Sequence, residues 1–306
     1  MREPDRLNWL APEIARDLAA ADTNAFRLAG SGQSTVEMFG TACLISTPDA
    51  MPDGLESLLG QIHAHARACG IHPPSDVFHR TLAVGPGSED APVRVRGAGG
   101  ASFEAREGGL AYGVDFAGGY SSGFFIDQRE NRRRVRECRP SRALNCFAFT
   151  CSFSVAAAAV GAATVSVDLS KRSLARGREN FERNHLATTG HRFIADDVFD
   201  VLPRLARRGE KFDVIILDPP TFARGNGGRV FRAAEDFPRL IRLAVACAAP
   251  GARILVSTNC SRLTPAALAR AVREAVPGAG IRPCPPPPDC AAGPAAVSAW
   301  VGAVES

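Results

Sequence analysis

The sequence predicts an α/β protein in which a mainly parallel sheet follows a small α+β region. From about Leu144 onward, apolar strand-like runs alternate with helical patterns, and this alternation indicates right-handed crossovers between parallel strands. Residues 1–118 instead contain short strand-like runs punctuated by glycine and proline, which mark turns. The chain is 45% hydrophobic and 22% charged, so a packed core is expected and general disorder is excluded.

The α+β region, residues 1–118, is predicted to contain two helices and several short strands. Apolar residues at helical spacing favour an amphipathic helix over 6–19. A second helix is expected over 54–69, because Gly70 is a typical stop signal. The predicted strands cover residues 25–28, 41–46, 77–84, 93–95 and 110–116.

The second region, residues 119–306, carries the strand–helix alternation. No G-x-G-x-x-G string opens it, so a dinucleotide-binding fold is disfavoured. The predicted strands cover residues 143–149, 163–167, 193–195, 212–217, 252–256 and 297–301. The predicted helices cover residues 154–160, 171–185, 198–208, 233–248 and 265–275.

Several protein classes are disfavoured by composition. No run approaches the roughly 18–20 apolar residues of a membrane span, and the first residues lack the pattern of a secretory signal. The nine cysteines form no Cys-x-x-Cys pair and are irregularly spaced, so reduced thiols are expected rather than disulfides or zinc. We expect a cytoplasmic protein that uses neither a membrane nor a metal, and the oligomeric state stays open.

Arginine dominates the basic residues. The chain has two lysines and thirty-four arginines and a formal net charge of +4, a bias that codon usage in a GC-rich genome explains. Seven arginines and two glutamates fall within residues 129–142. Such a run is typical either of a solvated helix face or of a phosphate-binding surface. On the second interpretation, Arg133, Arg134 and Arg136 are candidate RNA contacts.

Acidic residues follow three predicted strands: Asp168, Asp197 and Asp218. Ligands of open α/β sheets bind beyond the carboxyl ends of the strands. Asp168 lies about twenty residues after the first strand of this sheet, where an acid can accept both hydroxyls of a ribose. The alternative is a helix N-cap, because a helix is predicted directly after it.

Two turns at these strand ends suit a nucleoside ligand and a planar base. Residues 150–154 open a helix, and its first N–H groups can face a carboxylate or phosphate. Asp218-Pro219-Pro220 has fixed φ angles and few free donors, so it can present carbonyls and an apolar wall to a base. Taken alone, this tripeptide is equally typical of an ordinary proline turn.

Five segments in one order carry a family resemblance: Gly118–Arg132, Leu144–Ala157, Val165–Lys171, Asp197–Phe199 and Leu217–Phe222. Together they resemble the class I S-adenosylmethionine-dependent methyltransferases of the RlmI-like large-subunit (23S) rRNA methyltransferase family. The resemblance is strong over 118–262. It implies a Rossmann-like class I methyltransferase domain with a mainly parallel seven-stranded sheet over 119–306. Residues 1–118 would form a preceding α+β region with an RNA-binding role.

The resemblance also implies a role for individual residues. Asp168 would hold the ribose hydroxyls of S-adenosylmethionine, and Asp197 would accept from the adenine amino group with Val198 beside the ring. The turn 150–152 would lie near the methionine end. Asp218, Pro219 and Pro220 would border the transferred methyl and the target base. The full implied cofactor set is Phe124, Gln128, Arg132, Phe147, Thr150, Cys151, Ser152, Asp168, Leu169, Asp197, Val198 and Asp218.

The chain departs from its relatives at the first turn and leaves the acceptor atom open. Relatives commonly have two glycines where this chain has Cys151-Ser152, and side chains there can crowd the cofactor. Cys260 lies in a segment that resembles the one carrying the nucleophile of cytosine-C5 methylating relatives, and a thiolate is what that chemistry needs. The Asp-Pro-Pro-Thr-Phe string also resembles guanine-N7 methylating relatives, which use no covalent intermediate.

The expected function is methyl transfer from S-adenosylmethionine to a base in RNA, foremost 23S rRNA, with cytosine C5 slightly favoured over guanine N7. The catalytic candidates are Cys260, Asp218, Pro219 and Pro220. One alternative is a methyltransferase of the same fold with a small-molecule or protein acceptor. The other is an RNA-binding relative whose altered turn no longer holds cofactor.

Overall fold

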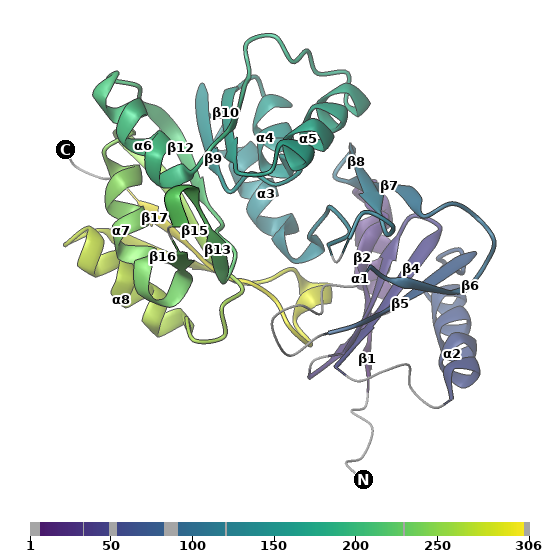
Figure 1. Ribbon diagram of the computed structural model, residues 1–306. Helices are drawn as coiled ribbons and strands as arrows, with labels where there is room; N and C mark the ends of the chain where they lie inside the picture. The colour runs from purple at the N-terminus through teal and green to yellow at the C-terminus, as the bar shows by residue number, and fades with distance from the viewer. Residues whose placement is uncertain are drawn as a thin grey trace. The chain divides into compact units, whose positions relative to one another are not determined.

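A computed structural model describes residues 7–32, 34–48, 54–82, 91–119, 121–228 and 230–302. The chain forms two compact units (Figure 1). The first comprises Met1–Arg129 together with Pro287–Ala295, and the second comprises Glu130–Pro286 with Ala296–Ser306. The short segment Pro287–Ala295 therefore belongs to the first unit, although it lies between two strands of the second along the chain.

The first unit contains a six-stranded sheet in the order β1-β2-β3-β4-β5-β6. Its pairs are antiparallel except β4–β5, which are parallel and are connected through α2. Apolar residues of α1 and α2 pack on this sheet and close its core. The elements are β1 (Asn8–Trp9), α1 (Pro12–Ala20), β2 (Ala25–Ser31), β3 (Ser34–Phe39), β4 (Ala42–Thr47), α2 (Leu55–Ala68), β5 (Asp76–Thr81), β6 (Val93–Arg96), the hairpin β7 (Ser102–Glu107) and β8 (Leu110–Asp115), η1 (Ile126–Gln128) and η3 (Pro288–Cys290).

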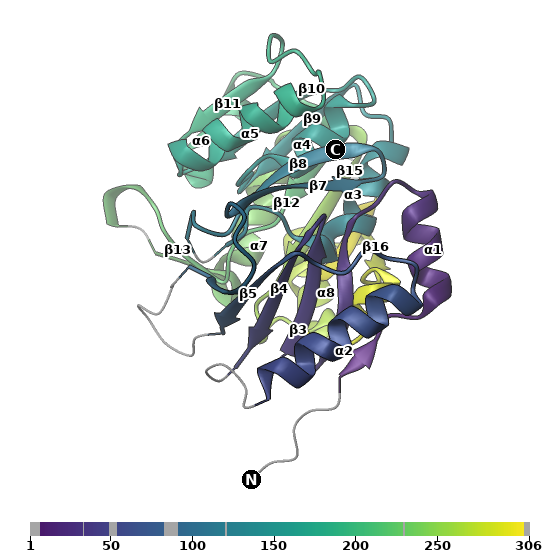
Figure 2. The ribbon, with the colours of Figure 1, turned by 90° about the vertical axis from the view of Figure 1, so that its right-hand side faces the viewer.

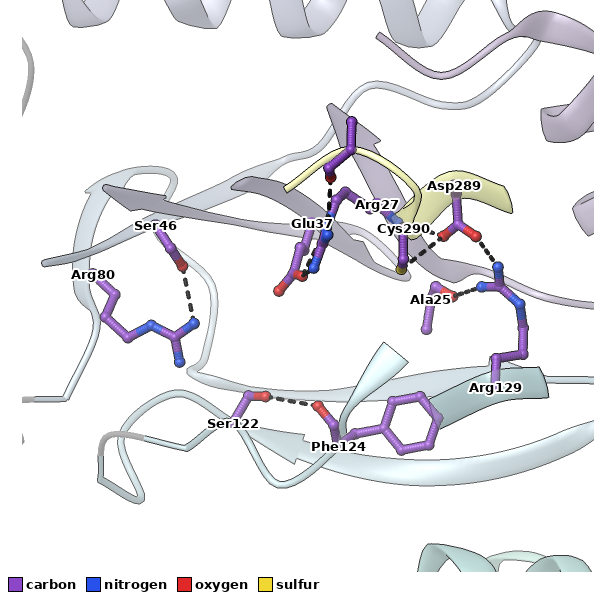
Figure 3. A network of polar contacts seen from close by, with 11 residues as sticks. Ala25, Arg27, Glu37, Ser46, Arg80, Ser122, Phe124, Arg129, Asp289 and Cys290 are labelled. Atoms are coloured by element: carbon purple, nitrogen blue, oxygen red, sulfur yellow. Dashed lines mark hydrogen bonds and ion pairs between the residues drawn. The ribbon is translucent and has the colours of Figure 1, made fainter. Parts of the chain in front are cut away.

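A buried charge network ties the segment around Asp289 into the first unit (Figure 3). The Asp289 carboxylate accepts from the backbone N–H of Arg27 at 2.9 Å and pairs with the Arg129 guanidinium. Arg129 also donates to the Ala25 carbonyl, and the Arg27 guanidinium pairs with Glu37 at 3.0 Å. Because buried charges need partners, these contacts fix the late segment against β2.

The second unit contains a seven-stranded sheet in the order β11-β10-β9-β12-β15-β17-β16. All neighbouring pairs are parallel except those of β17, which is antiparallel to both β15 and β16. This confirms the predicted mainly parallel sheet. Its strands are β9 (Arg142–Cys146), β10 (Ala163–Asp168), β11 (Arg192–Ala195), β12 (Phe212–Leu217), β15 (Ala248–Thr258), β16 (Gly280–Cys284) and β17 (Val297–Gly302).

Helices cover both faces of this sheet, because its central strands are apolar on both sides (Figures 1 and 2). Alternate residues such as Leu144 and Ile215 face α6, α7 and α8, whereas Ala143 and Val214 face α3 and α4. The helices are α3 (Arg129–Glu137), α4 (Ser152–Ala158), α5 (Lys171–Arg183), α6 (Val198–Arg207), α7 (Ala233–Val245) and α8 (Pro265–Ala275). The short hairpin β13 (Phe222–Arg224) and β14 (Val230–Arg232) follows β12, with η2 (Asn226–Gly228) at its tip.

Several sequence-based element predictions were wrong. The helix predicted over 6–19 begins only at Pro12, which occupies the first turn that proline favours, and Asn8–Trp9 forms an edge strand instead. Strands β3, β7 and β16 and the β13–β14 hairpin were not predicted. The strand predicted over 77–84 ends at Thr81, and its residues 83–84 lie outside the described residues.

Candidate active site at the carboxyl edge of the seven-stranded sheet

Two turns predicted to be functional follow neighbouring strands. The β9 turn, residues 147–151, connects β9 to α4, and the β12 turn, residues 218–221, follows β12. β9 and β12 pair in parallel, with Cys146 opposite Leu217. Their carboxyl ends therefore lie together at one edge of the sheet, which is where ligands of such sheets bind.

The β9 turn has a constrained backbone. Phe147, Phe149 and Cys151 all have positive φ, at 58°, 47° and 60°. Such conformations cost on the order of 1–3 kcal/mol each for residues other than glycine, and persist only where the surroundings enforce them. Here the Phe149 N–H donates to Asp168 Oδ2 at 2.8 Å, and Asn180 Nδ2 donates to the Thr150 carbonyl at 2.9 Å. The shape of the turn is thus held by the end of β10 and by α5.

Asp168 ends β10 as a half-buried carboxylate. Besides Phe149, its Oδ1 accepts from the Ser170 N–H at 2.8 Å. Burial raises the pKa of Asp168 above its ordinary value, while these two backbone hydrogen bonds oppose the rise. A carboxylate offers about four acceptor positions, so this group retains capacity for ligand hydroxyls.

The N-cap alternative for Asp168 was wrong, because Ser170 takes that place. Ser170 Oγ accepts from the Ser173 N–H at 3.1 Å, and α5 begins at Lys171. Leu169, between the acid and the cap, is 40% exposed. An exposed apolar side chain beside an acid suits the ring and sugar of a nucleoside.

Cys151 packs away into the interior. Its side chain is fully buried, and burial raises the pKa of its thiol to about 12. A Cβ at Gly177 of α5 would overlap Cys151 Sγ and lie 2.9 Å from Cys151 Cβ. The absence of a side chain at Gly177 therefore accommodates the cysteine of the β9 turn.

Arg132 and Ser152 lie together at the start of α4. Arg132 is 1% exposed, and its Nη1 lies 3.5 Å from Ser152 Oγ. Its guanidinium also lies over the Phe153 ring, 5.8 Å from the centroid. A buried guanidinium forms an environment that favours a carboxylate or another anion.

Asp197 caps α6 and holds the β13–β14 hairpin. Its Oδ1 accepts from the Phe199 N–H at 2.8 Å, its Oδ2 accepts from the Asn226 N–H at 3.2 Å, and it is 4% exposed. The Asn226 side chain donates to Asp196 Oδ1 at 2.8 Å. Sequence reasoning missed Asn226, although an Asn-Gly pair between Phe222 and Phe231 is a hairpin signal. Val198, the first residue of α6, is buried.

The β12 turn lies beside the segment that carries Cys260. β12 pairs with β15, and Thr221 Oγ1 donates to Asn259 Oδ1 at 3.0 Å. Cys260 is 4% exposed, and its N–H donates to Thr258 Oγ1 at 3.1 Å. Within the turn, Asp218 is half-buried, Pro219 buried and Pro220 exposed. The structure thus brings the catalytic candidates to one pair of strand ends.

Other predicted residues belong to the first unit or to the surface of α3. Phe124 and Gln128 belong to the first unit, where both are buried and Phe124 stacks on Tyr112 with ring centroids 4.6 Å apart. Their part in cofactor binding stays a prediction. On α3, Arg133 is exposed but pairs with Glu130 at 2.8 Å and with Glu137, whereas Arg134 and Arg136 are half-buried.

Across the ranges that the structure describes, no cluster of three or more metal-ligating side chains occurs. Within the same ranges, no helix has the length and apolarity needed to cross a membrane.

Comparison with known proteins identifies a family for this chain. The S-adenosylmethionine-dependent methyltransferase family matches residues 74–297. Ribosomal RNA large subunit methyltransferase I of Salmonella arizonae is 37% identical over 202 residues, which are 64% of this chain and 48% of that protein. The chain thus spans about half the length of the curated relatives it matches.

Solved structures share the fold. SMU.776, a methyltransferase solved in complex with SAH, is 25% identical with a TM-score of 0.77, covering 96% of this chain and 82% of that one. The S-adenosylmethionine-dependent methyltransferase of Agrobacterium tumefaciens has a TM-score of 0.71 at 20% identity, covering 92% and 90%. These matches confirm the predicted fold class, and the family match confirms the resemblance seen in the motifs. The chain belongs to the S-adenosylmethionine-dependent methyltransferase family.

Proposed function

We propose that this chain transfers a methyl group from S-adenosylmethionine to a base in RNA, and that large-subunit rRNA is the substrate. One observation carries the proposal: the β9 turn with Asp168 and the β12 turn with Cys260 follow adjacent strands of one sheet. Methyl transfer needs the donor and acceptor held in line and in contact. The choice of rRNA rests on the name of the Salmonella arizonae relative.

The residues of the β9 side fit the cofactor. Asp168 has acceptor capacity for the ribose hydroxyls, and Leu169 and Val198 offer apolar contacts to adenine. Arg132, buried beside Ser152, suits the methionine carboxylate. S-adenosylmethionine itself supplies a methyl group on a positively charged sulfur, so the leaving group is already activated. The protein's task is then to position the two reactants.

Cytosine C5 is the atom we favour, because Cys260 lies next to the β12 turn. C5 is a weak nucleophile until a thiolate adds to C6 of the ring, and this addition places electron density on C5. After methylation, loss of the C5 proton and of the thiolate restores the cytosine ring. Guanine N7 is the second candidate, since it carries its own lone pair and requires only positioning.

Cofactor binding and methyl transfer test the proposal separately. Isothermal titration should give saturable binding of S-adenosylmethionine to the full chain. Tritium from methyl-labelled cofactor should then appear in purified 23S rRNA, and mass mapping of that rRNA should identify the modified nucleotide. Absence of cofactor binding would support an RNA-binding relative, and label transfer only to protein or small molecules would rule out the RNA substrate.

A further inference from the structure

The β13–β14 hairpin presents two faces of different character. Its strands pair antiparallel, with Phe222 opposite Arg232, Ala223 opposite Phe231, and Arg224 opposite Val230. Side chains alternate between the faces of such a pair. Ala223 and Phe231 are on the covered face, and the other four residues are all exposed.

The covered face anchors the hairpin to the second unit. Phe231 is 4% exposed, and its ring lies 5.7 Å from the rings of both Phe147 and Phe199, centroid to centroid. At the tip, Asn226 is held by Asp196 and Asp197. At the base, the Ala233 N–H donates to the Thr221 carbonyl at 3.1 Å. These contacts hold the exposed face in a defined position directly after Pro220.

The exposed face alternates apolar and basic residues. Phe222 is 49% exposed and Val230 is 36% exposed, and they are two of the five large apolar side chains exposed to this degree in the described ranges. Each stands opposite an exposed arginine. Among the described residues, neither the Arg224 nor the Arg232 guanidinium has an acidic partner. The Asp236 carboxylate does lie near, since it accepts from the backbone N–H of Arg232 at 2.8 Å. The face therefore offers a flat apolar ring and two guanidinium groups that form no ion pair with the described residues.

We propose that this face binds single-stranded RNA, with a base stacked on Phe222 and flanking phosphates paired with Arg224 and Arg232. The inference rests on the proposed RNA methyltransferase function and extends it to a substrate-binding surface outside the β12 turn. Single-stranded RNA is recognised by stacking of unpaired bases on aromatic rings and by basic residues along the backbone. No residue of this face is acidic, so a polyanion with flat bases fits it better than a typical protein surface.

Binding of a short RNA tests the proposal. The probe is a fluorescein-labelled single-stranded RNA of about ten nucleotides, within the site size of one binding module, and affinity is read by anisotropy over a range of salt. Phe222→Ala should weaken binding about tenfold, as expected when one base no longer stacks. The double variant Arg224→Ala/Arg232→Ala should reduce the slope of log affinity against log salt by about 1.4, or 0.7 for each phosphate that is no longer neutralised.

A matched control distinguishes loss of the hairpin arginines from a general loss of two positive charges. Arg207→Ala/Arg208→Ala removes two exposed arginines at the end of α6 and should leave both affinity and slope close to those of the unaltered chain. Cofactor affinity by isothermal titration should be unchanged in every variant, which shows that the fold is intact. With 5-iodouridine in the RNA, irradiation should cross-link Phe222, as identified by mass spectrometry.

The outcomes separate the inference from the proposed function. If the unaltered chain methylates rRNA but the hairpin variants bind RNA as it does, or the cross-link maps elsewhere, the RNA-binding face is wrong and the function stands. If polyglutamate of equal charge displaces the RNA as well as RNA itself does, the face recognises charge alone and the stacking role is wrong. If the unaltered chain neither binds cofactor nor methylates rRNA, the proposed function fails first.

Discussion

The β9 turn and the β12 turn lie at the same sheet edge but are stabilised in different ways. In the β9 turn, three residues other than glycine have positive φ, and side chains of Asp168 and Asn180 hold the backbone. In the β12 turn, Pro219 and Pro220 fix φ by their own rings. There the bond between Thr221 and Asn259 connects the turn to the neighbouring segment.

This difference corresponds to the two reactants in the proposed reaction. S-adenosylmethionine is a small ligand of fixed structure. A rigid backbone conformation that is held by many buried contacts therefore suits its binding. A base in a large RNA must reach the site from outside, so a turn whose proline rings fix the backbone while Pro220 stays exposed is an advantage. Variants of each turn should therefore change different quantities: cofactor affinity for the β9 turn, and turnover or RNA affinity for the β12 turn.

The largest effect is expected at the β12 side. Cys260→Ala should reduce methyl transfer more than about 1,000-fold, as removal of a nucleophile does, and leave cofactor affinity unchanged. RNA containing 5-fluorocytosine should trap a covalent adduct with the unaltered chain, visible on denaturing gels, and none with Cys260→Ala. Cys260→Ser should behave in the same way, because a hydroxyl ionises far less than a thiol.

Cys138→Ala provides the control for that experiment. Cys138 is half-buried and contacts Arg253. It precedes the amino-terminal end of β9, whereas both turns follow the carboxyl ends of their strands, so full activity is expected. Full activity of Cys260→Ala would instead exclude the covalent route. It would leave direct transfer to a ring nitrogen such as guanine N7 as the better account of the β12 turn.

At the β9 side, Asp168→Ala should weaken S-adenosylmethionine binding by about one to two orders of magnitude. Charge-assisted hydrogen bonds are worth roughly 1.5–3 kcal/mol. A 2′-deoxyribose analogue of the cofactor product distinguishes direct contact from a loosened turn. The unaltered chain should discriminate against the analogue, whereas Asp168→Ala should bind both forms alike. Retained discrimination in the variant would remove Asp168 from the ribose site.

The raised pKa of Asp168 adds a pH dependence. Burial favours the protonated carboxyl, while the proposed ribose contact uses the ionised form as an acceptor. Cofactor affinity should therefore fall as the pH is lowered through this raised pKa, at a higher pH than an ordinary aspartate would give. Titrations of affinity against pH should show the step in the unaltered chain and not in Asp168→Asn, which cannot ionise.

A smaller effect is expected from overpacking the contact between the β9 turn and α5. Gly177→Ala places a methyl group where Cys151 Sγ lies, and overpacking of this kind costs about 1–3 kcal/mol. The melting temperature and the cofactor affinity should both fall. Adding Cys151→Gly to Gly177→Ala should restore both quantities, because loss of the Cys151 side chain removes the overlap with the new methyl group. A double variant no better than Gly177→Ala alone would show that the two residues are not coupled.

The strands beneath both turns could be predicted from sequence because they are apolar on both faces. Short apolar runs such as Phe212–Leu217 are typical of buried strands. The acidic residues that follow such runs indicate the carboxyl edge of the sheet. Strand β3 was missed because Ser34–Phe39 mixes polar and apolar residues between two stronger signals. Strand β16 was missed because Gly280–Cys284 is largely exposed and contains Pro283, which fits an edge strand alone.

Contacts between distant residues had no sequence signal. The packing of Cys151 against Gly177 depends on how α5 lies on the β9 turn. In the sequence, a glycine inside a helical pattern indicates only a position of low helix propensity. Asp289 lies 262 residues from Arg27 along the chain, so its place in the first unit could not be deduced from the prolines around it. The hairpin carried a local signal in Asn226-Gly227, which the glycine-rich composition obscured.

The smallest effect is expected from the arginines of α3, the surface that the sequence favoured for RNA. Arg133 already pairs with Glu130 and Glu137, so most of its charge is compensated before any RNA arrives. Arg133→Ala/Arg134→Ala/Arg136→Ala should lower RNA affinity and flatten its salt dependence, but by less than Arg224→Ala/Arg232→Ala does, although it removes one more positive charge. Cofactor affinity should barely change. Anisotropy titrations of both variants with the same RNA make the comparison. A larger decrease at α3 than at the hairpin would mean that the number of arginines, and not their freedom from acidic partners, determines where RNA binds.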